Sequence, residues 1–181
     1  MKENNKLKTR DIAYIGIFVA FIAISSWICI PTTVPITMQT LGIFTTVLVL
    51  GLKRGTLAVL VYIVLGGIGL PVFSGFSGGM GILLGANGGY IIGFLFSAII
   101  IGSIIKFFGE KIWIMVIAML AGLLACYSFG TAWFVYVYTQ TTEPVGIVAA
   151  LGWCVFPFII PDILKIFLAV ILKKRIGNAI M

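Results

Sequence analysis

The sequence alternates between long apolar runs and short polar segments that carry most of its charge. The runs lack the roughly ten-residue alternating segments that are typical of transmembrane β-barrels. A helix satisfies its own backbone hydrogen bonds in lipid, so helices are expected. The pattern predicts an all-α, polytopic membrane protein that forms one transmembrane domain over residues 1–181. It places six spans at about 11–30, 38–52, 55–70, 89–108, 112–138 and from 161 onward.

The last apolar region is interrupted by two prolines. Residues 144–160 are apolar but contain Pro157, and Pro161 follows directly. Proline either breaks a helix or occupies its first turn. We therefore expect a short outer helix at 145–154, then a break, and then a sixth span that starts at Pro161.

The distribution of charge predicts the orientation of these spans, because cytoplasmic loops are enriched in lysine and arginine. With the N-terminus inside, eleven of the 12 basic residues fall on the cytoplasmic side: Lys2, Lys6, Lys8, Arg10, Lys53, Arg54, Lys106, Lys111, Lys173, Lys174 and Arg175. A seventh crossing at 144–160 would put the last three of them outside. Six transmembrane helices with both termini in the cytoplasm are therefore predicted.

Composition supports a membrane setting and excludes several kinds of site. Only 9% of the residues are charged, against about 25% in a soluble domain, so the cell membrane is the expected location. The net charge of +7 does not indicate nucleic-acid binding, because the basic residues only cap the apolar runs. Cys29, Cys126 and Cys154 lie far apart in apolar surroundings and histidine is absent, so neither a metal site nor a cofactor is expected.

One opposite-charge pair lies inside the membrane envelope. Asp162 and Lys165 are three positions apart, so on a helix they share a face. Lys165 precedes Lys173 by eight residues, which is roughly 12 Å of helix. The hydrocarbon core is about 30 Å thick, so the pair lies well inside it. An ion pair inside the membrane is either structural or faces a cavity. We prefer the second interpretation, in which a lysine at a helix start suits an anion and an aspartate accepts hydrogen bonds from ligand N–H groups.

A glycine-rich region lies between the predicted third and fourth spans. Residues 66–93 hold eleven of the chain's 22 glycines but no Gly-Lys-Ser/Thr sequence, so a phosphate-binding loop is disfavoured. Tight helix packing and turns would explain the glycines. A non-helical outer loop that dips over a cavity would explain them equally well. In that second case Asn87 and Tyr90 would supply polar contacts.

A further outer segment joins the first two spans. Residues 31–38 are uncharged and contain two prolines, so they form either an inert turn or a lid over a pocket. Gln39 follows at the head of the second span and is a candidate polar contact. Together with 71–88 and 139–160, this outer loop is expected to cover a ligand pocket.

The first predicted span carries a face of small residues. Ala13, Gly16, Ala20 and Ala23 recur at spacings of three, four and three, which places them on one narrow side of a helix. Small side chains allow another helix to approach closely in a membrane. The approaching helix is either another span of this chain or a separate membrane partner.

Several of these segments together resemble the BioY family, the biotin-specific S components of energy-coupling factor (ECF) transporters. The resemblance runs from about residue 10 to 176 and rests on the motifs VPITMQTL at 34–41, GLPVFSG at 69–75, GGMG at 78–81, LGANGGY at 84–90, GF at 93–94 and PDILK at 161–165. Two details depart from the family pattern. A Gly-Pro-Thr-Gly type of sequence is expected at 85–88, and a glycine often precedes the aspartate at 162.

The resemblance implies six helices, high-affinity capture of biotin from outside, and docking of the small-residue face onto the transmembrane coupling subunit. It also implies that separate ATPase subunits supply the energy, since this chain has no P-loop. Biotin has a carboxylate, a ureido ring and an apolar thioether ring. We expect the substrate-binding residues to be Gln39, Phe73, Asn87, Tyr90, Trp153, Asp162 and Lys165, with the aromatic side chains flanking the apolar body.

Three other functions stay open from the sequence. The chain could be an S component for another vitamin, which ligand competition would distinguish. It could be an intramembrane enzyme that uses Asp162 and Lys165 as acid and base, although no histidine, metal cluster or second carboxylate supports this. It could also be a membrane scaffold without a ligand. A non-enzymatic role in biotin uptake, with no catalytic residue, is the prediction that we prefer.

Overall fold

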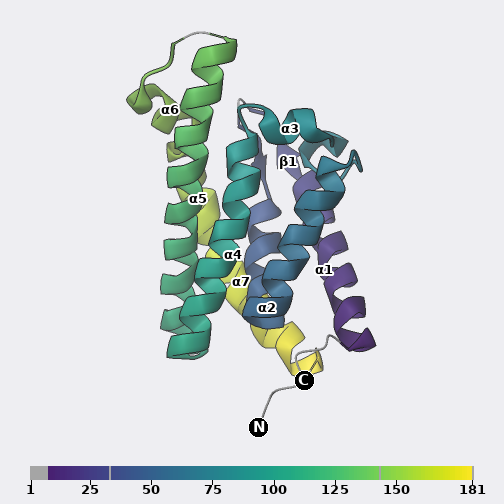
Figure 1. Cartoon of the computed structure of the whole chain (residues 1–181). Coiled ribbons are helices and arrows are strands. Elements are labelled where there is room, and N and C mark those ends of the chain that lie inside the picture. The colour runs from purple at the N-terminus through teal and green to yellow at the C-terminus, as the bar shows by residue number, and fades with distance from the viewer. Residues whose placement is uncertain (1–7, 33, 143, 181) are drawn as a thin grey trace.

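The computed structural model describes residues 8–32, 34–142 and 144–180 (Figure 1). It is almost entirely helical, as the apolar pattern predicts. The elements in chain order are α1 (Thr9–Trp27), β1 (Cys29–Ile30), β2 (Ile36–Thr37), α2 (Gln39–Gly67), the 3-10 turn η1 (Ser74–Phe76), α3 (Met80–Leu84), α4 (Gly88–Phe108), α5 (Ile112–Thr141), α6 (Ile147–Cys154) and α7 (Phe156–Ile180). The two short strands pair antiparallel at one end of the bundle. Lys2 and Lys6 of the charge argument lie outside the described residues.

The region assigned to α2 is a helical hairpin, because the chain reverses at Gly51. This residue has φ 75° and ψ −179°, a conformation that residues with a Cβ rarely adopt. The two arms pack against each other: a Cβ at Gly55 would lie 2.8 Å from the Cα of Val47. The arms correspond to the predicted spans 38–52 and 55–70, and the reversal falls just before the basic pair Lys53 and Arg54.

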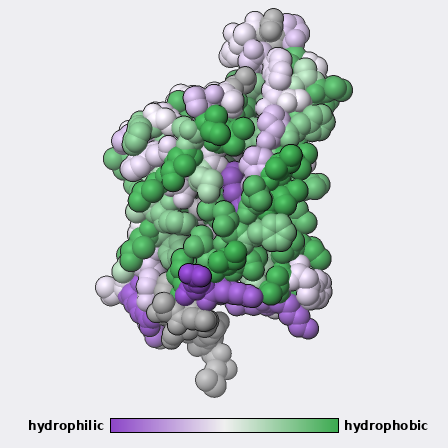
Figure 2. Space-filling view, turned by 180° about the vertical axis from the view of Figure 1, so that it is seen from behind, coloured by the Kyte–Doolittle hydropathy of each residue, from purple (hydrophilic) through white to green (hydrophobic). Residues whose placement is uncertain are grey.

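By length and composition, four of the described helices can cross a membrane, namely α1, α4, α5 and α2, where α2 is counted as one element across its reversal. The α6–α7 pair is bent by 40° at its break and makes a fifth if it is counted as one span. Figure 2 shows a broad hydrophobic band over the middle of one face, with hydrophilic residues gathered at its lower end. These features are those of a multi-pass membrane protein.

The helices stand side by side, and α1 begins at the same end of the bundle at which α7 ends (Figure 1). Two salt bridges connect elements at this end. Arg54 of the α2 reversal pairs with Asp11 of α1 at 3.2 Å, and Lys173 of α7 pairs with Glu110 at 3.2 Å. The acidic residues here are thus matched by the basic residues on which the orientation argument rests.

The last span starts earlier than predicted. A short outer helix, α6, does precede a break at Val155, but α7 begins at Phe156 and contains Pro161 in its interior. Pro157 falls in the first turn of α7, where backbone N–H groups have no partner within the helix, so its missing N–H removes no hydrogen bond. At Pro161 the helix loses the N–H that would have bonded the Pro157 carbonyl, yet α7 continues past it to Ile180. The prediction that the sixth span starts at Pro161 is therefore wrong.

The glycine-rich outer stretch is folded back on the bundle. Residues 71–88 contain η1 and α3, so the stretch is not the non-helical loop of the second alternative but includes two short helical turns. Two side chains of α1 hold the start of this stretch: the Trp27 indole donates to the Pro71 carbonyl at 2.9 Å, and the Ser26 hydroxyl donates to the Val72 carbonyl at 2.6 Å. The stretch therefore forms a fixed cover at the end of the bundle that lies away from the chain termini.

Candidate functional site

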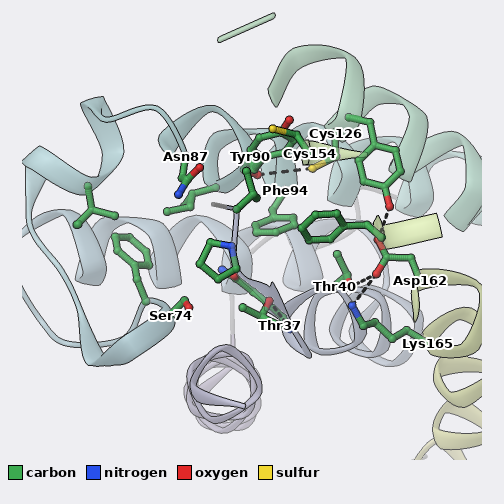
Figure 3. Close-up of a pocket in the computed structure, with 18 of the residues that line it drawn as sticks. Thr37, Thr40, Ser74, Asn87, Tyr90, Phe94, Cys126, Cys154, Asp162 and Lys165 are labelled. Carbon is green, nitrogen blue, oxygen red and sulfur yellow. Dashed lines mark hydrogen bonds and ion pairs between the residues drawn. The ribbon is translucent and has the colours of Figure 1, made fainter. Parts of the chain in front are cut away.

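A cavity of about 170 Å³ lies beneath the outer segments (Figure 3). A single water needs only about 10–15 Å³ measured in this way, so the space suits a small organic molecule. Its lining includes Val34, Pro35 and Thr37 from residues 31–38, Phe73, Ser74, Ser77, Ile82 and Asn87 from residues 71–88, and Cys154 and Phe158 from residues 139–160. Helices α2, α4, α5 and α7 supply the rest of the wall.

The ionic centre of the cavity is the carboxylate of Asp162. Its Oδ1 atom accepts hydrogen bonds from Lys165 Nζ at 2.6 Å and from the Thr40 hydroxyl at 2.8 Å. Its Oδ2 atom accepts a hydrogen bond from the Tyr127 hydroxyl. Asp162 is 1% exposed and Lys165 is 4% exposed. Opposite charge and two hydroxyl donors together offset the desolvation of this carboxylate.

The hydrogen-bonding capacity of the pair is not exhausted by these contacts. A carboxylate has about four lone-pair sites, and three of those of Asp162 are occupied by Lys165, Thr40 and Tyr127. An ammonium group has three N–H donors. Among the described residues, the one hydrogen-bond partner found for Lys165 is Asp162. The pair thus offers one acceptor site and two donors to a molecule in the cavity.

Gln39 lines the cavity and connects it to the outer cover. Its side-chain amide donates to the Tyr62 hydroxyl at 2.7 Å, and that hydroxyl donates to the Val72 carbonyl at 3.1 Å. Tyr62 is fully buried and packs edge-to-face against Phe73, with ring centroids 5.5 Å apart. This chain of contacts joins both arms of the α2 hairpin to the 71–88 stretch.

Tyr90 and Asn87 occupy the start of α4. The Tyr90 ring packs directly over Gly130 of α5, where an added Cβ would lie 2.2 Å from the ring. The Tyr90 hydroxyl is hydrogen-bonded to Thr131 at 3.0 Å, with either atom as donor. Asn87 is the residue before the first turn of α4. Figure 3 shows Asn87 and Ser74 at one side of the cavity and Asp162 and Lys165 at the other.

The structure brings six of the seven candidate binding residues to this cavity: Gln39, Phe73, Asn87, Tyr90, Asp162 and Lys165. Trp153 is not among the lining residues. It is 43% exposed and its ring lies 6.2 Å from that of Tyr138. The helix start that was expected to support Lys165 lies at Phe156 instead, so α7 presents no N-terminal N–H groups beside the pair.

Two functional neighbours of Asp162 escaped the sequence reasoning. Thr40 follows Gln39 directly in the VPITMQTL segment, where only the glutamine attracted attention. Tyr127 lies near the middle of the 30-residue helix α5. Tyrosine in membrane proteins concentrates at the lipid–water interfaces. A tyrosine at mid-span was therefore a usable signal for a buried hydroxyl partner.

Comparison with known proteins shows which family and which solved fold this chain resembles. The family model described as "BioY family" matches residues 1–181. A Thermotoga maritima protein named "Biotin transporter BioY" is 36% identical over 168 residues, covering 92% of this chain and 95% of that protein. A Pyrococcus horikoshii protein named "Probable biotin transporter BioY" is 36% identical over 174 residues, covering 95% and 99%. A crystal structure of the S-component for biotin from an ECF-type ABC transporter superimposes with a TM-score of 0.84 at 30% identity, covering 98% of this chain and 95% of that one.

Proposed function

The chain belongs to the BioY family, and from this we propose that it captures biotin and takes it up across the membrane as the substrate-binding subunit of an ECF transporter. One observation carries the proposal. In a fold that matches a biotin S-component along nearly its whole length, the Asp162–Lys165 pair is not sealed in protein but lines a cavity of about 170 Å³.

The polarity of the cavity suggests how biotin lies in it. Asp162 and Lys165 cancel each other's charge at 2.6 Å, so the pair gains little from a second carboxylate. A ureido group has N–H donors and a carbonyl acceptor, which match the free acceptor site of Asp162 and the free donors of Lys165. We therefore place the ureido ring at this pair and the apolar ring between Phe73 and Tyr90.

The carboxylate tail then points to the opposite side of the cavity. Asn87 and Ser74 lie there, next to the first turn of α4. The N–H groups of a helix start favour an anion. In this orientation the start of α4 favours the ligand carboxylate, a role that the sequence argument gave to the start of the sixth span.

We also propose the topology of six crossings with both termini in the cytoplasm. The reversal at Gly51 divides α2 into two antiparallel arms, and the bent α6–α7 pair supplies one crossing. The described ends of α1 and α7 lie together (Figure 1). The basic residues of the 53–54 and 106–111 regions would then face the cytoplasm beside those of α7.

The small-residue face of α1 is the proposed docking site for the coupling subunit. Ala13, Gly16 and Ala20 are exposed, and an added Cβ at Gly16 would meet nothing within 4 Å. Ala23, the fourth member, is 5% exposed and belongs to the core. ATP hydrolysis would take place on separate subunits. This part of the proposal rests on the family and on the exposure of three small residues.

The function is tested by equilibrium binding of radiolabelled biotin to the detergent-purified chain, with thiamine, riboflavin and lipoate as competitors. Saturable biotin binding that unlabelled biotin abolishes and the other three leave unchanged is the expected result. Displacement by another vitamin at equal concentration would assign the subunit to that vitamin instead. Conversion of bound biotin to a new product would indicate an enzyme.

A further inference from the structure

A second cavity, of about 750 Å³, lies between α5 and the α6–α7 pair and adjoins the cavity proposed to bind biotin, which we call the biotin cavity. Its wall is mostly aliphatic and comes from three helices. The lining residues are Leu120, Leu123, Leu124, Tyr127, Ser128, Thr131, Ala132 and Val135 of α5, Ile147 and Leu151 of α6, Val155 at the break, and Ile159, Asp162 and Ile163 of α7. We call this space the α5–α7 groove. Several of its side chains face outward; Leu124, for example, is 68% exposed.

The groove and the biotin cavity meet at a shared wall. Tyr127 and Asp162 are the two residues that line both spaces. The Tyr127 hydroxyl donates to Asp162 Oδ2. In the part of the chain that the structure describes, no other hydrogen bond is found between α5 and α7. Tyr127 and Asp162 therefore form the boundary between the two spaces, with the tyrosine hydroxyl bonded to the carboxylate.

The membrane position of the groove restricts what can occupy it. Its α5 wall runs from Leu120 to Val135, which is about 22 Å of helix. One leaflet contributes about 15 Å of hydrocarbon, half of the bilayer core. The groove is long enough to hold the full hydrocarbon depth of one leaflet. Water is a poor occupant, because a hydrated groove would expose aliphatic side chains to it.

The volume of the groove argues against a second helix, from this or another chain, as its occupant. A helix with side chains is about 10 Å across, so 22 Å of it would occupy roughly 1,700 Å³. The groove has less than half of that space. A hydrocarbon chain about 4 Å thick at van der Waals contact would occupy roughly 280 Å³ over the same length. One or both acyl chains of a single phospholipid therefore fit.

We propose that the α5–α7 groove binds the acyl chain of a membrane phospholipid, which seals the Tyr127–Asp162 wall of the biotin cavity from outside. The chain packs against the Tyr127 ring and keeps water away from the bond between α5 and α7. Asp162 is the one charged residue in the lining, and its carboxylate is bonded to Lys165 and Tyr127, so recognition depends on the hydrocarbon chain and not on the head group. The acyl site itself is independent of the identity of the ligand in the neighbouring cavity.

The proposal is tested with the detergent-purified full chain and a phosphatidylcholine that carries a photoactivatable diazirine in the middle of one acyl chain. The lipid is added at one to two molecules per protein, and the adducts are mapped by mass spectrometry. We expect saturable labelling concentrated on the groove residues of α5, α6 and α7. Phosphatidylglycerol with the same chains should compete as well as phosphatidylcholine does.

Two variants fill the groove from its exposed side, A132W and L124W, and V64W places the same ring on an exposed face of α2. The groove variants should reduce labelling at least fivefold, while V64W should leave it unchanged. Labelling spread evenly over the exposed apolar positions of the unmodified chain would overturn the proposal, as would equal labelling of A132W and V64W. Neither readout measures biotin, so failure here is distinct from failure of the proposed function.

Discussion

Gln39 and Tyr62 stand 23 positions apart, yet the Gln39 amide donates a hydrogen bond of 2.7 Å to the Tyr62 hydroxyl. In one continuous helix the two would be about 34 Å apart. The contact exists because α2 reverses at Gly51. The same contact links the cavity to the outer cover, because Gln39 lines the cavity and Tyr62 donates in turn to the Val72 carbonyl.

Tyr62→Phe tests whether this bridge stabilises the fold. The substitution leaves the buried Gln39 amide without this partner, whereas the Val72 carbonyl keeps its bond from Ser26. An unpaired buried polar group costs about 1–3 kcal/mol. The apparent melting temperature in detergent should fall by several degrees. Tyr14→Phe is the matched control, because that hydroxyl only accepts a bond from exposed Arg10. Equal melting of the two variants would show that the bridge contributes nothing.

Charge removal at Asp162 and Lys165 separates the structural role of the pair from its ligand role. Asp162→Asn leaves the Lys165 ammonium buried without a counter-charge, which destabilises a protein by about 3–5 kcal/mol. Combining it with Lys165→Met removes both charges and should recover most of that stability. Biotin binding should be lost in the single and the double variant. A stable double variant that binds biotin like the parent would mean that the pair serves the fold alone.

Tyr127→Phe and Thr40→Val test the hydroxyls that position the Asp162 carboxylate. Each bond to a charged group contributes about 1.5–3 kcal/mol, and its loss lets the carboxylate turn away from the ligand. We expect the dissociation constant for biotin to rise about tenfold in each variant, as measured by calorimetry. Ser128→Ala, one position away on α5, is the control. An unchanged affinity in Tyr127→Phe would remove Tyr127 from the site.

Much of this architecture was predictable from the apolar pattern, and the misses share a physical cause. The predicted boundaries of the fourth and fifth spans agree with α4 and α5 within a few residues at each end, because each lies between short polar segments. The start of α7 was misplaced because a proline inside a helix reads like a proline that begins one. Periodicity places Trp153 near the outer end but does not show that it faces Tyr138.

The cavity itself was predictable only in its charged and motif residues. Asp162 and Lys165 are conspicuous in an apolar run, so their role as a buried pair could be inferred from sequence. Tyr127 joins them only through the crossing of α5 and α7, which are 35 positions apart at this contact. A single sequence has no signal for such a long-range contact. The groove likewise lies where the α6–α7 pair, bent by 40° at its break, packs beside α5.

Gly130 is predicted to be required beneath the Tyr90 ring. An alanine Cβ there would lie 2.2 Å from the ring, so Tyr90 would have to move and would lose its contact with Thr131. Overpacking of this kind costs about 1–3 kcal/mol. Gly130→Ala should therefore lower the melting temperature and weaken biotin binding. Gly152→Ala is the control, because its Cβ would meet nothing within 4 Å and alanine favours a helix by about 1 kcal/mol.

Gly16→Leu and Ala20→Leu test the docking face of α1. Both positions are exposed, so a leucine does not enter the core. Purified variants should bind biotin like the parent, whereas uptake by cells that contain the coupling and ATPase subunits should fall at least tenfold. Ile17→Leu changes a neighbouring side chain that is 62% exposed and should leave uptake intact.

Ala23→Leu tests the buried member of the small-residue face of α1. Ala23 shares the small-residue face but is 5% exposed, so a leucine there must displace core side chains. It should lower the melting temperature of the isolated chain, which the two outward variants should not do. If Gly16→Leu and Ala20→Leu lost uptake while Ala23→Leu lost stability, the same helix face would serve both docking to the coupling subunit and packing in the core. If the outward variants transported biotin normally, the docking role of this face would be wrong.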